Sequence, residues 1–406
     1  MTPNSSRLFQ ASCVALIVTA MSFALRGGAS TDWGAEFHLS NEQLGWINGT
    51  AFWGFTIAMV VGGPLCDALG LAFIMRVAFI GHLVGILLTI FAWDYKSLYA
   101  GTLIFGIANG SVEAACNPLI ATLFPNDKTT KLNAFHVWFP GGIVIGGLLA
   151  FALGHLGLGW KIQFACMLIP LGIYGVMFLR ENFPKTERVQ RGVSTGAMFA
   201  ACLNPIFILM VGCMLLTAAT ELAPNQWIPN ILTNAGVSGI LVLVWITGIQ
   251  AVGRMFAGVF VHRIAPEGML LASAAISALG LYTLSISSGV MLFGSATVFA
   301  IGVCFFWPTM LGYVSERFPR TGALGLAIMG GAGMLSVSVV LPIMGHFYDQ
   351  GIASRLSPGE KANATIEAAA GLQTLGRVSL LPCLLIVIFL IVFFLQKRFS
   401  ADLKKT

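Results

Sequence analysis

Charged residues are scarce in this chain. Asp, Glu, Lys and Arg together make up 9% of its 406 residues, whereas a soluble globular domain carries about 25%. Hydrophobic residues make up 57%. The composition therefore excludes an ordinary soluble domain and indicates a protein that lies mostly within a lipid bilayer.

The sequence also lacks the motifs of common catalytic and metal sites. It contains no HExxH zinc motif, no phosphate-binding loop, no dinucleotide fingerprint and no nucleophile elbow. The eight cysteines are scattered without metal-ligand spacing. We therefore predict no enzyme, no metal site and no cofactor. The net charge of +6 comes without a basic patch that contains interleaved aromatics, so no nucleic-acid partner is predicted.

Most of the sequence consists of long apolar runs. Twelve runs are long enough to cross a bilayer, for which about 20 helical residues suffice. They cover residues 8–30, 42–65, 72–93, 98–123, 131–154, 161–179, 204–225, 238–261, 268–286, 289–313, 322–346 and 375–396. We predict an all-α membrane protein with twelve transmembrane helices.

Two polar segments interrupt these runs. Residues 180–203 form a basic linker, which divides the helices into two pseudo-symmetric six-helix bundles, an N-terminal one (1–179) and a C-terminal one (204–406). Residues 347–374 are predicted to form a polar loop before the last helix. Most of the 22 Lys and Arg residues fall in loops on the same side as the two termini. By the positive-inside rule, both termini of this multi-pass protein are predicted to lie on the cytoplasmic side of the cell (inner) membrane.

A glutamate in the middle of the fourth run carries the strongest functional signal. Glu113 is flanked by Asn109 and Asn117 at i−4 and i+4, which places all three on one predicted helix face. A carboxylate at the centre of a membrane helix costs about 2.5–3.5 kcal/mol, so it is tolerated mainly where it faces a cavity or a partner. We interpret Glu113 as a proton-coupling and substrate-binding residue, with Asn109 and Asn117 as substrate-binding neighbours. A structural carboxylate bonded to a neighbouring helix is the alternative.

The two halves echo each other at an offset of about 195 residues, which is typical of transporters with a substrate site between parallel repeats. This offset relates Arg26 in the first helix to Glu221 in the seventh. Arg26 is interpreted as a cavity cation that pairs with Glu113 or binds an anionic substrate, or else as a side chain that reaches the outer interface. Glu221 is interpreted as a second proton or substrate group, or else as a helix-end acid among the lipid headgroups.

Three further substrate-binding candidates are aromatic. His136 and Trp138 lie in the first turns of the fifth helix, and Trp307 lies in the tenth. Packing is the alternative role of a lone histidine, and interface anchoring is the alternative for the tryptophans. Arg254 in the eighth helix is interpreted as a structural bridge to an acid near the cytoplasm such as Glu316.

The end of the second helix resembles a motif of the major facilitator superfamily. Residues 63–70 read GPLCDALG and match the Gly-x-x-x-Asp loop of that family. The resemblance implies that Asp67 helps to lock the two halves together. The usual basic residues of the motif are missing, and Arg76 is the candidate to replace them.

A narrower resemblance lies in the fourth and fifth helices. Residues 110–118 (GSVEAACNP) and 131–133 (KLN) are similar to the fucose permease branch, the fucose–galactose–glucose:proton symporters. This similarity implies proton coupling and sugar binding for Glu113, and it places the family's helix-5 glutamine near His136. The branch carries a helix-1 aspartate where this chain has Arg26.

Taken together, these features predict a secondary active transporter that works by alternating access. The first hypothesis is proton-coupled symport of a hexose or related sugar by a monomer. The second is symport of a sugar acid or other organic anion, which Arg26 favours. A transport-inactive membrane sensor is the alternative from another class. The predicted partners are a small polar solute, protons and the lipid bilayer.

Overall fold

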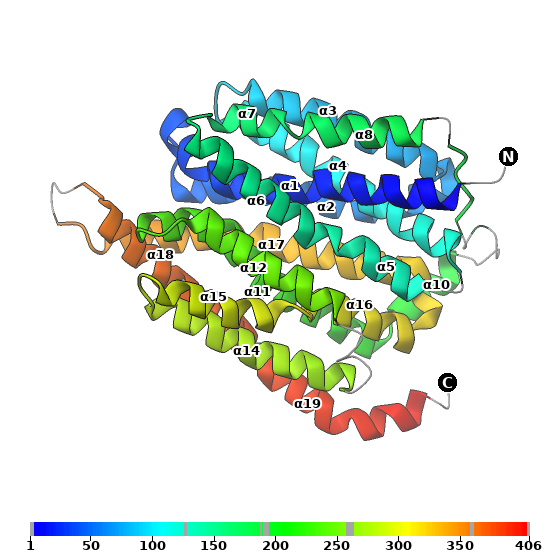
Figure 1. Cartoon of the computed structure of the whole chain (residues 1–406). Helices are drawn as coiled ribbons and strands as arrows, with labels where there is room; N and C mark the ends of the chain where they lie inside the picture. Colours follow the sequence, from blue (N-terminus) through cyan, green and yellow to red (C-terminus); the bar gives the residue numbers. More distant parts are fainter. Residues whose placement is uncertain are drawn as a thin grey trace.

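The computed structural model describes residues 4–125, 128–179, 181–186, 189, 195–256, 264–357 and 361–403, and this part of the chain is helical and contains no strand. The helices run in the order shown in Figure 1. Their bounds are α1 (Ser5–Phe37), α2 (Asn41–Leu69), α3 (Leu71–Ile90), α4 (Tyr95–Leu123), α5 (Lys128–His136), α6 (Trp138–His155), α7 (Trp160–Ala165), α8 (Leu168–Phe178), α10 (Thr195–Cys202), α11 (Pro205–Asn234), α12 (Gly239–Met255), α14 (Pro266–Ile286), α15 (Met291–Val303), α16 (Phe306–Arg317), η1 (Pro319–Thr321), α17 (Gly322–Ala353), α18 (Ala364–Val378) and α19 (Leu380–Leu403).

These helices confirm the predicted all-α membrane fold. In the described residues, 11 helical segments are long and apolar enough to span a membrane, and α12 is a shorter apolar helix that coincides with the remaining predicted run. The predicted loop 347–374 is wrong at both ends, because α17 continues to Ala353 and α18 begins at Ala364. The Asn363 side chain accepts a hydrogen bond from the Ile366 amide and caps α18, so this polar sequence begins a helix.

The two halves of the chain lie side by side along one long seam. In Figure 1, α1–α4, α7 and α8 occupy the upper part of the molecule and most of α11–α19 the lower part, and α6 and α5 descend to the level of α12 and α17. Across the seam, α2 packs along α17, α6 packs against α12, and α1 packs against α11. The first residue of α1 and the last residue of α19 lie at the same end, at the right of Figure 1. We call this end the termini side and the opposite end the distal side.

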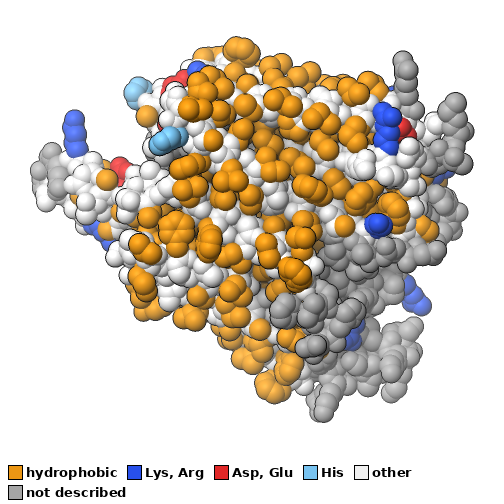
Figure 2. All heavy atoms as spheres, viewed as in Figure 1, with side chains coloured by type: hydrophobic (Ala, Val, Ile, Leu, Met, Phe, Trp, Pro, Cys, Tyr) orange, Lys and Arg blue, Asp and Glu red, His pale blue; other side chains and the backbone are white. Residues whose placement is uncertain are grey.

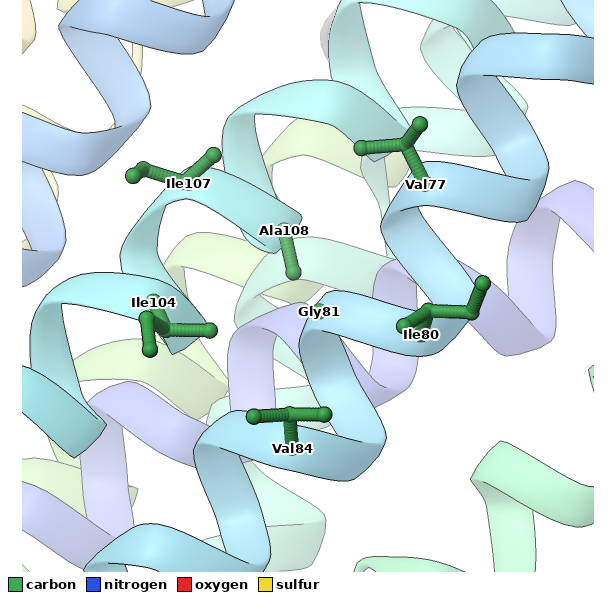
Figure 3. A pocket seen from close by; sticks show the side chains of 7 residues that line it. All are labelled: Val77, Ile80, Gly81, Val84, Ile104, Ile107 and Ala108. Carbon is green, nitrogen blue, oxygen red and sulfur yellow. The ribbon is translucent and has the colours of Figure 1, made fainter.

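The surface of the molecule is apolar around its middle. Many large aliphatic and aromatic side chains are exposed on several helices. In Figure 2, hydrophobic side chains cover most of the visible face, and the coloured charged groups lie toward its two ends. Figure 3 shows an apolar groove of about 320 Å³ between α3 and α4. It is lined by Val77, Ile80, Gly81, Val84, Ile104, Ile107 and Ala108. Such a surface fits a lipid environment.

The seam between α2 and α17 is tightest on the distal side. A Cβ atom added to Gly345 would lie 2.5 Å from the carbonyl oxygen of Asn41, so only glycine allows this approach. Toward the termini side, a Cβ atom at Gly63 would lie 3.9 Å from the Ala327 Cβ, which is ordinary contact. The two halves are therefore in closest contact at the distal end.

Polar contacts hold the same distal end together. Asp349 of α17 accepts hydrogen bonds of 3.0 Å from the Asn41 side chain and 3.0 Å from the Glu42 amide at the start of α2. His346 lies 3.5 Å from the Glu42 carboxylate. A carboxylate at a helix N-terminus is stabilised by the unpaired amides and the helix dipole. We call Asn41, Glu42, His346 and Asp349 the distal latch.

Removing the central acid of the distal latch should open the distal side. Hydrogen bonds to a charged group contribute about 1.5–3 kcal/mol each, so Asp349→Ala should raise the distal-open population tenfold or more. A reporter cysteine at Ser338, which is buried in the described structure beside Gly49, measures this opening. We expect maleimide to label purified Ser338→Cys protein about tenfold faster when Asp349→Ala is also present.

Two further substitutions make this measurement specific. Cys383 is exposed and should be replaced by serine to lower the background. Glu36→Gln removes a distal-side acid that pairs with Lys161 inside the N-terminal half, so it should leave the labelling rate unchanged. An unchanged rate with Asp349→Ala would show that the distal latch does not hold the two halves together.

Candidate functional site

Glu113 lies at one end of a hydrogen-bonded chain that connects two helices. It is buried in α4, with 5% of its surface exposed. The Asn117 amide nitrogen donates to the Glu113 carboxylate over 3.3 Å, and the Asn117 oxygen lies 3.1 Å from Nε2 of His136 in α5. Because Asn117 donates through its nitrogen, its oxygen accepts, so His136 donates through Nε2. The structure thus brings Glu113, Asn117 and His136 together.

The local structure of α4 explains how Glu113 is placed. Pro118 lacks an amide hydrogen, so it frees the carbonyl of Ala114 one turn earlier. The thiol of Cys66 in α2 donates to this carbonyl over 3.4 Å. A Cβ atom at Gly110 would lie 2.5 Å from the carbonyl oxygen of Phe55, so α2 and α4 touch backbone to backbone. These contacts with α2 fix the segment of α4 that carries Glu113.

Asn109 belongs to a different network, which corrects the prediction of one shared face. Its oxygen lies 2.9 Å from Nε2 of His82, and its nitrogen donates to the Ser22 hydroxyl over 3.1 Å. Nδ1 of His82 lies 2.9 Å from the Tyr174 hydroxyl. Each step of four residues rotates a helical side chain by about 40°, so Asn109 and Asn117 differ by about 80°. Asn109 therefore faces the interior of the N-terminal half.

Arg26 is buried, and it does not pair with Glu113. It has no exposed surface, which rules out a side chain that reaches the interface. The bond between Asn109 and Ser22 aligns α1 with α4. Relative to that bond, Arg26 lies one turn toward the distal side and Glu113 one turn toward the termini side. Eight helical residues span about 12 Å along the axis, which is too far for an ion pair.

The guanidinium of Arg26 instead contacts backbone carbonyls and aromatic rings. Nε donates to the Ser22 carbonyl over 3.1 Å, and Nη1 donates to the Asn48 carbonyl over 3.3 Å. The guanidinium carbon lies 4.9 Å from the Phe23 ring centre and 5.9 Å from that of Phe52. The remaining nitrogen, Nη2, has no partner among the described residues. Arg26 is thus a buried cation with one free donor group.

Glu221 forms an ion pair with Arg254, whereas the predicted pair of Glu113 with Arg26 is not formed. Arg254 Nη2 in α12 lies 2.7 Å from the Glu221 carboxylate in α11, and Gln250 donates to the same oxygen over 3.3 Å. Arg254 Nε donates over 2.9 Å to the carbonyl of Cys304, which Pro308 leaves without an amide partner. Because Glu221 is buried in the middle of α11, its interpretation as a helix-end headgroup acid is wrong.

Polar residues lie between the two buried acids, Glu113 in the N-terminal half and Glu221 in the C-terminal half. The α5 helix, which ends at His136, contacts α12, the helix that carries Arg254. Polar groups therefore extend from Glu113 in one half, through Asn117 and His136, toward Arg254 and Glu221 in the other. Sequence analysis paired the charges differently, since it joined Arg26 with Glu113 and Arg254 with Glu316. The Glu316 side chain lies outside the described residues.

The two predicted tryptophans, Trp138 and Trp307, are not part of the hydrogen-bonded chain that contains Glu113. Trp138 is 40% exposed at the start of α6. Trp307 packs on α17, where a Cβ atom at Gly333 would lie 3.0 Å from its ring. Neither tryptophan hydrogen-bonds to Glu113 within the described part of the chain.

Asp67 contacts the linker between the two halves. It accepts a hydrogen bond of 2.5 Å from the hydroxyl of Thr186, which lies in the linker 180–203. Arg76 is exposed and forms no hydrogen bond or ion pair within the described segments. The latch roles of Asp67 and Arg76 remain predictions.

Two polar residues near Arg26 were missed by sequence analysis. Asn48 in α2 and Gln226 in α11 are both buried, with 1% and 3% of their surface exposed. Their side-chain oxygens have no partner in the described structure. An amide inside an apolar run is a weaker form of the signal that identified Glu113, and it could have found both residues.

A family model and several relatives of known name match this sequence. The sequence model of the Major Facilitator Superfamily matches residues 12–264. The chain is 26% identical to a gentisate transporter of Corynebacterium glutamicum, over 76% of this chain and 74% of the relative. It is 28% identical to a 3-(3-hydroxy-phenyl)propionate transporter of Escherichia coli, over 79% and 77% of the two chains. It is 23% identical to a hexuronate transporter of Bacillus subtilis, over 68% and 70%.

Solved structures show the same fold. The crystal structure of a D-xylose-proton symporter superimposes with a TM-score of 0.74 over 94% of this chain and 96% of that chain, at 15% sequence identity. The sequence relatives and this structural neighbour are transporters rather than enzymes. This is consistent with the prediction that the protein is not an enzyme.

Proposed function

Because the chain belongs to the Major Facilitator Superfamily, we propose that it is a proton-coupled secondary transporter of a small organic anion that works by alternating access. The narrower resemblance to the fucose permease branch remains a prediction from the sequence. The relatives named for gentisate, 3-(3-hydroxyphenyl)propionate and hexuronate, all carboxylic acids, match over 68–79% of this chain, whereas a D-xylose transporter of Levilactobacillus brevis matches over 36% of it. This favours the organic-anion hypothesis over the neutral hexose.

The observation that carries the proposal is the contrast between two buried carboxyl groups. Glu221 has a guanidinium 2.7 Å away, whereas Glu113 has only the amide of Asn117 and no ion pair in the described residues. A carboxylate buried without a cation is strongly disfavoured, while one in an ion pair is compensated. Glu113 is therefore suited to carry a proton, and Glu221 is suited to remain charged.

The position of Glu113 supports coupling between proton and conformation. Its hydrogen-bonded chain reaches the seam through His136, the last residue of α5, and α5 contacts α12, which carries Arg254 in the opposite half. When Glu113 gives up its proton, the new negative charge would attract the cation of Arg254 in the opposite half. A change in protonation thus changes the interaction between the halves, which is what alternating access requires.

The present conformation fits one step of this cycle. The distal side is closed by the distal latch, and the two halves are less tightly packed toward the termini side. With both termini in the cytoplasm, as the distribution of Lys and Arg favours, this is a carrier closed to the outside. Proton and anion would enter in the opposite conformation and leave toward the cytoplasm in this one.

Transport by reconstituted protein tests the proposal. We expect proteoliposomes with an inwardly directed proton gradient to accumulate labelled 3-hydroxybenzoate or glucuronate, and a protonophore to abolish this accumulation. Excess unlabelled organic acid should compete, and excess glucose or fucose should not. Accumulation of a neutral hexose that organic acids do not inhibit would return the function to the first hypothesis.

A further inference from the structure

Unpaired buried polar atoms gather on three helices. In the described part of the chain, the buried side-chain polar atoms without a partner all belong to α1, α2 and α11. They are Thr19 Oγ1, Arg26 Nη2, Trp33 Nε1, Asn48 Oδ1, Glu221 Oε2, Asn225 Oδ1 and Gln226 Oε1. Folded proteins leave few such groups unpaired, so each of these atoms needs a partner from outside the protein, either water or a ligand. Three of them belong to neighbouring residues: Asn48 contacts Arg26, and Gln226 contacts Phe23, whose ring lies beside Arg26.

The free atoms near Arg26 have defined chemistry. The nitrogen of Gln226 donates to the Phe23 carbonyl over 3.4 Å, so its oxygen is the group left free. Ser30 donates to the Arg26 carbonyl over 2.9 Å, and its hydroxyl oxygen accepts from the Asn48 nitrogen over 3.0 Å, which leaves the Asn48 oxygen free. The site therefore presents one cationic donor and two amide acceptors. Its ligand must supply an anion and hydroxyl donors.

The apolar walls of the site distinguish between two kinds of hydroxy acid. Phe23 and Phe52 lie beside the Arg26 guanidinium, and their rings pack edge to face at 5.2 Å. Phe139 packs on Phe23 at 5.2 Å from the other side. A hexuronate carries hydroxyl groups around its ring, and burying them against phenylalanine would leave them unpaired. An aromatic ring instead gains edge-to-face contacts with these side chains.

We propose that this site binds a hydroxy-substituted aromatic carboxylate, with its carboxylate on Arg26, its ring beside Phe23 and Phe52, and its hydroxyl on the free oxygen of Gln226. The inference rests on the proposed function and specifies its substrate class. Arg26 and Gln226 both contact Phe23, Arg26 through its guanidinium beside the ring and Gln226 through a hydrogen bond to the backbone carbonyl. A Cβ atom at Gly27 would lie 3.5 Å from the Gln226 carbonyl, so α1 and α11 are in contact at this level.

Binding to purified protein tests this assignment independently of proton coupling. The probes are 3-hydroxybenzoate, benzoate, 3-hydroxybenzyl alcohol and glucuronate, measured by calorimetry at one pH. We expect 3-hydroxybenzoate to bind about 10- to 100-fold more tightly than benzoate, because benzoate leaves a buried acceptor unpaired. The alcohol, which lacks the anion, should show no measurable binding. Glucuronate should bind more weakly than 3-hydroxybenzoate.

A variant of Gln226 links the hydroxyl preference to one residue. Gln226→Met keeps the length of the side chain but removes the acceptor, so 3-hydroxybenzoate and benzoate should then bind equally well. Gln163→Met is the matched control, since Gln163 is also a buried amide that donates to a backbone carbonyl, that of Leu158 over 3.2 Å, away from the site. It should retain the preference. Size-exclusion chromatography checks that both variants are folded.

A second substitution tests the anion contact. Arg26→Lys keeps the charge but loses the planar donor fork, so it should weaken binding of both benzoates about tenfold or more. Tighter binding of glucuronate than of 3-hydroxybenzoate would overturn the inference, as would a full hydroxyl preference in Gln226→Met. If organic-acid uptake is proton-driven but shows neither preference, the proposed function stands and this inference fails. If the preferences are found without proton-driven uptake, the inference stands and the coupling fails.

Discussion

Glu113→Gln is expected to abolish proton-driven accumulation while preserving exchange of substrate across the membrane. Glutamine keeps the shape of the protonated acid and can still bond to Asn117, which now lies 3.3 Å from the carboxylate. It cannot release a proton, so one half of the cycle loses its driving force. Exchange of internal for external substrate needs only the loaded carrier, so it should continue.

The measurement compares two modes in the same proteoliposomes. Accumulation of labelled substrate under a proton gradient should fall to the level of protein-free liposomes, and counterflow driven by unlabelled internal substrate should remain near that of the parent protein. Glu36→Gln is the control, because Glu36 pairs with Lys161 at the exposed distal surface and should support both modes. Intact accumulation by Glu113→Gln would show that the proton is carried elsewhere.

Arg254→Ala is expected to destabilise the whole protein. Its removal leaves Glu221 buried without its cation and takes the donor away from the Cys304 carbonyl. Breaking a buried ion pair on one side costs about 3–5 kcal/mol, which is a large part of the stability of a typical domain. We expect a marked loss of monodisperse protein and of thermal stability in detergent.

A second substitution separates lost charge balance from lost packing. Combining Arg254→Gln with Glu221→Gln removes both charges, so the double variant should be more stable than Arg254→Gln alone. Arg7→Gln is the control, since the pair of Arg7 with Glu181 leaves the arginine side chain 45% exposed. Such a surface pair contributes only about 0–1 kcal/mol. Equal destabilisation by Arg7→Gln and Arg254→Ala would contradict the special role of the buried pair.

Sequence analysis identified the two buried acids, Glu113 and Glu221, but not the ion pair that Glu221 forms. Glu113 and Glu221 stood out because carboxyl groups inside apolar runs are costly, and the structure buries both. Their partners could not be identified in the same way. The partner of Glu221 is Arg254, which lies 33 residues away on another helix. The predicted pair of Arg26 and Glu113 is wrong. Predicting it correctly would require the axial position of α1 relative to α4, which the hydropathy of the sequence does not give.

The sequence by itself determined the membrane location, the helical class, the approximate limits of the helices and the residues that are expensive to bury. These properties follow from transfer free energies, which add along the chain. Only the tertiary structure decided that Asn109 turns away from Glu113, that Arg26 retains a free donor, and that Asp349 closes the distal side. Each of these depends on the rotation and axial shift of one helix against another. Because a helix turns by about 100° per residue, small errors in register reassign every contact.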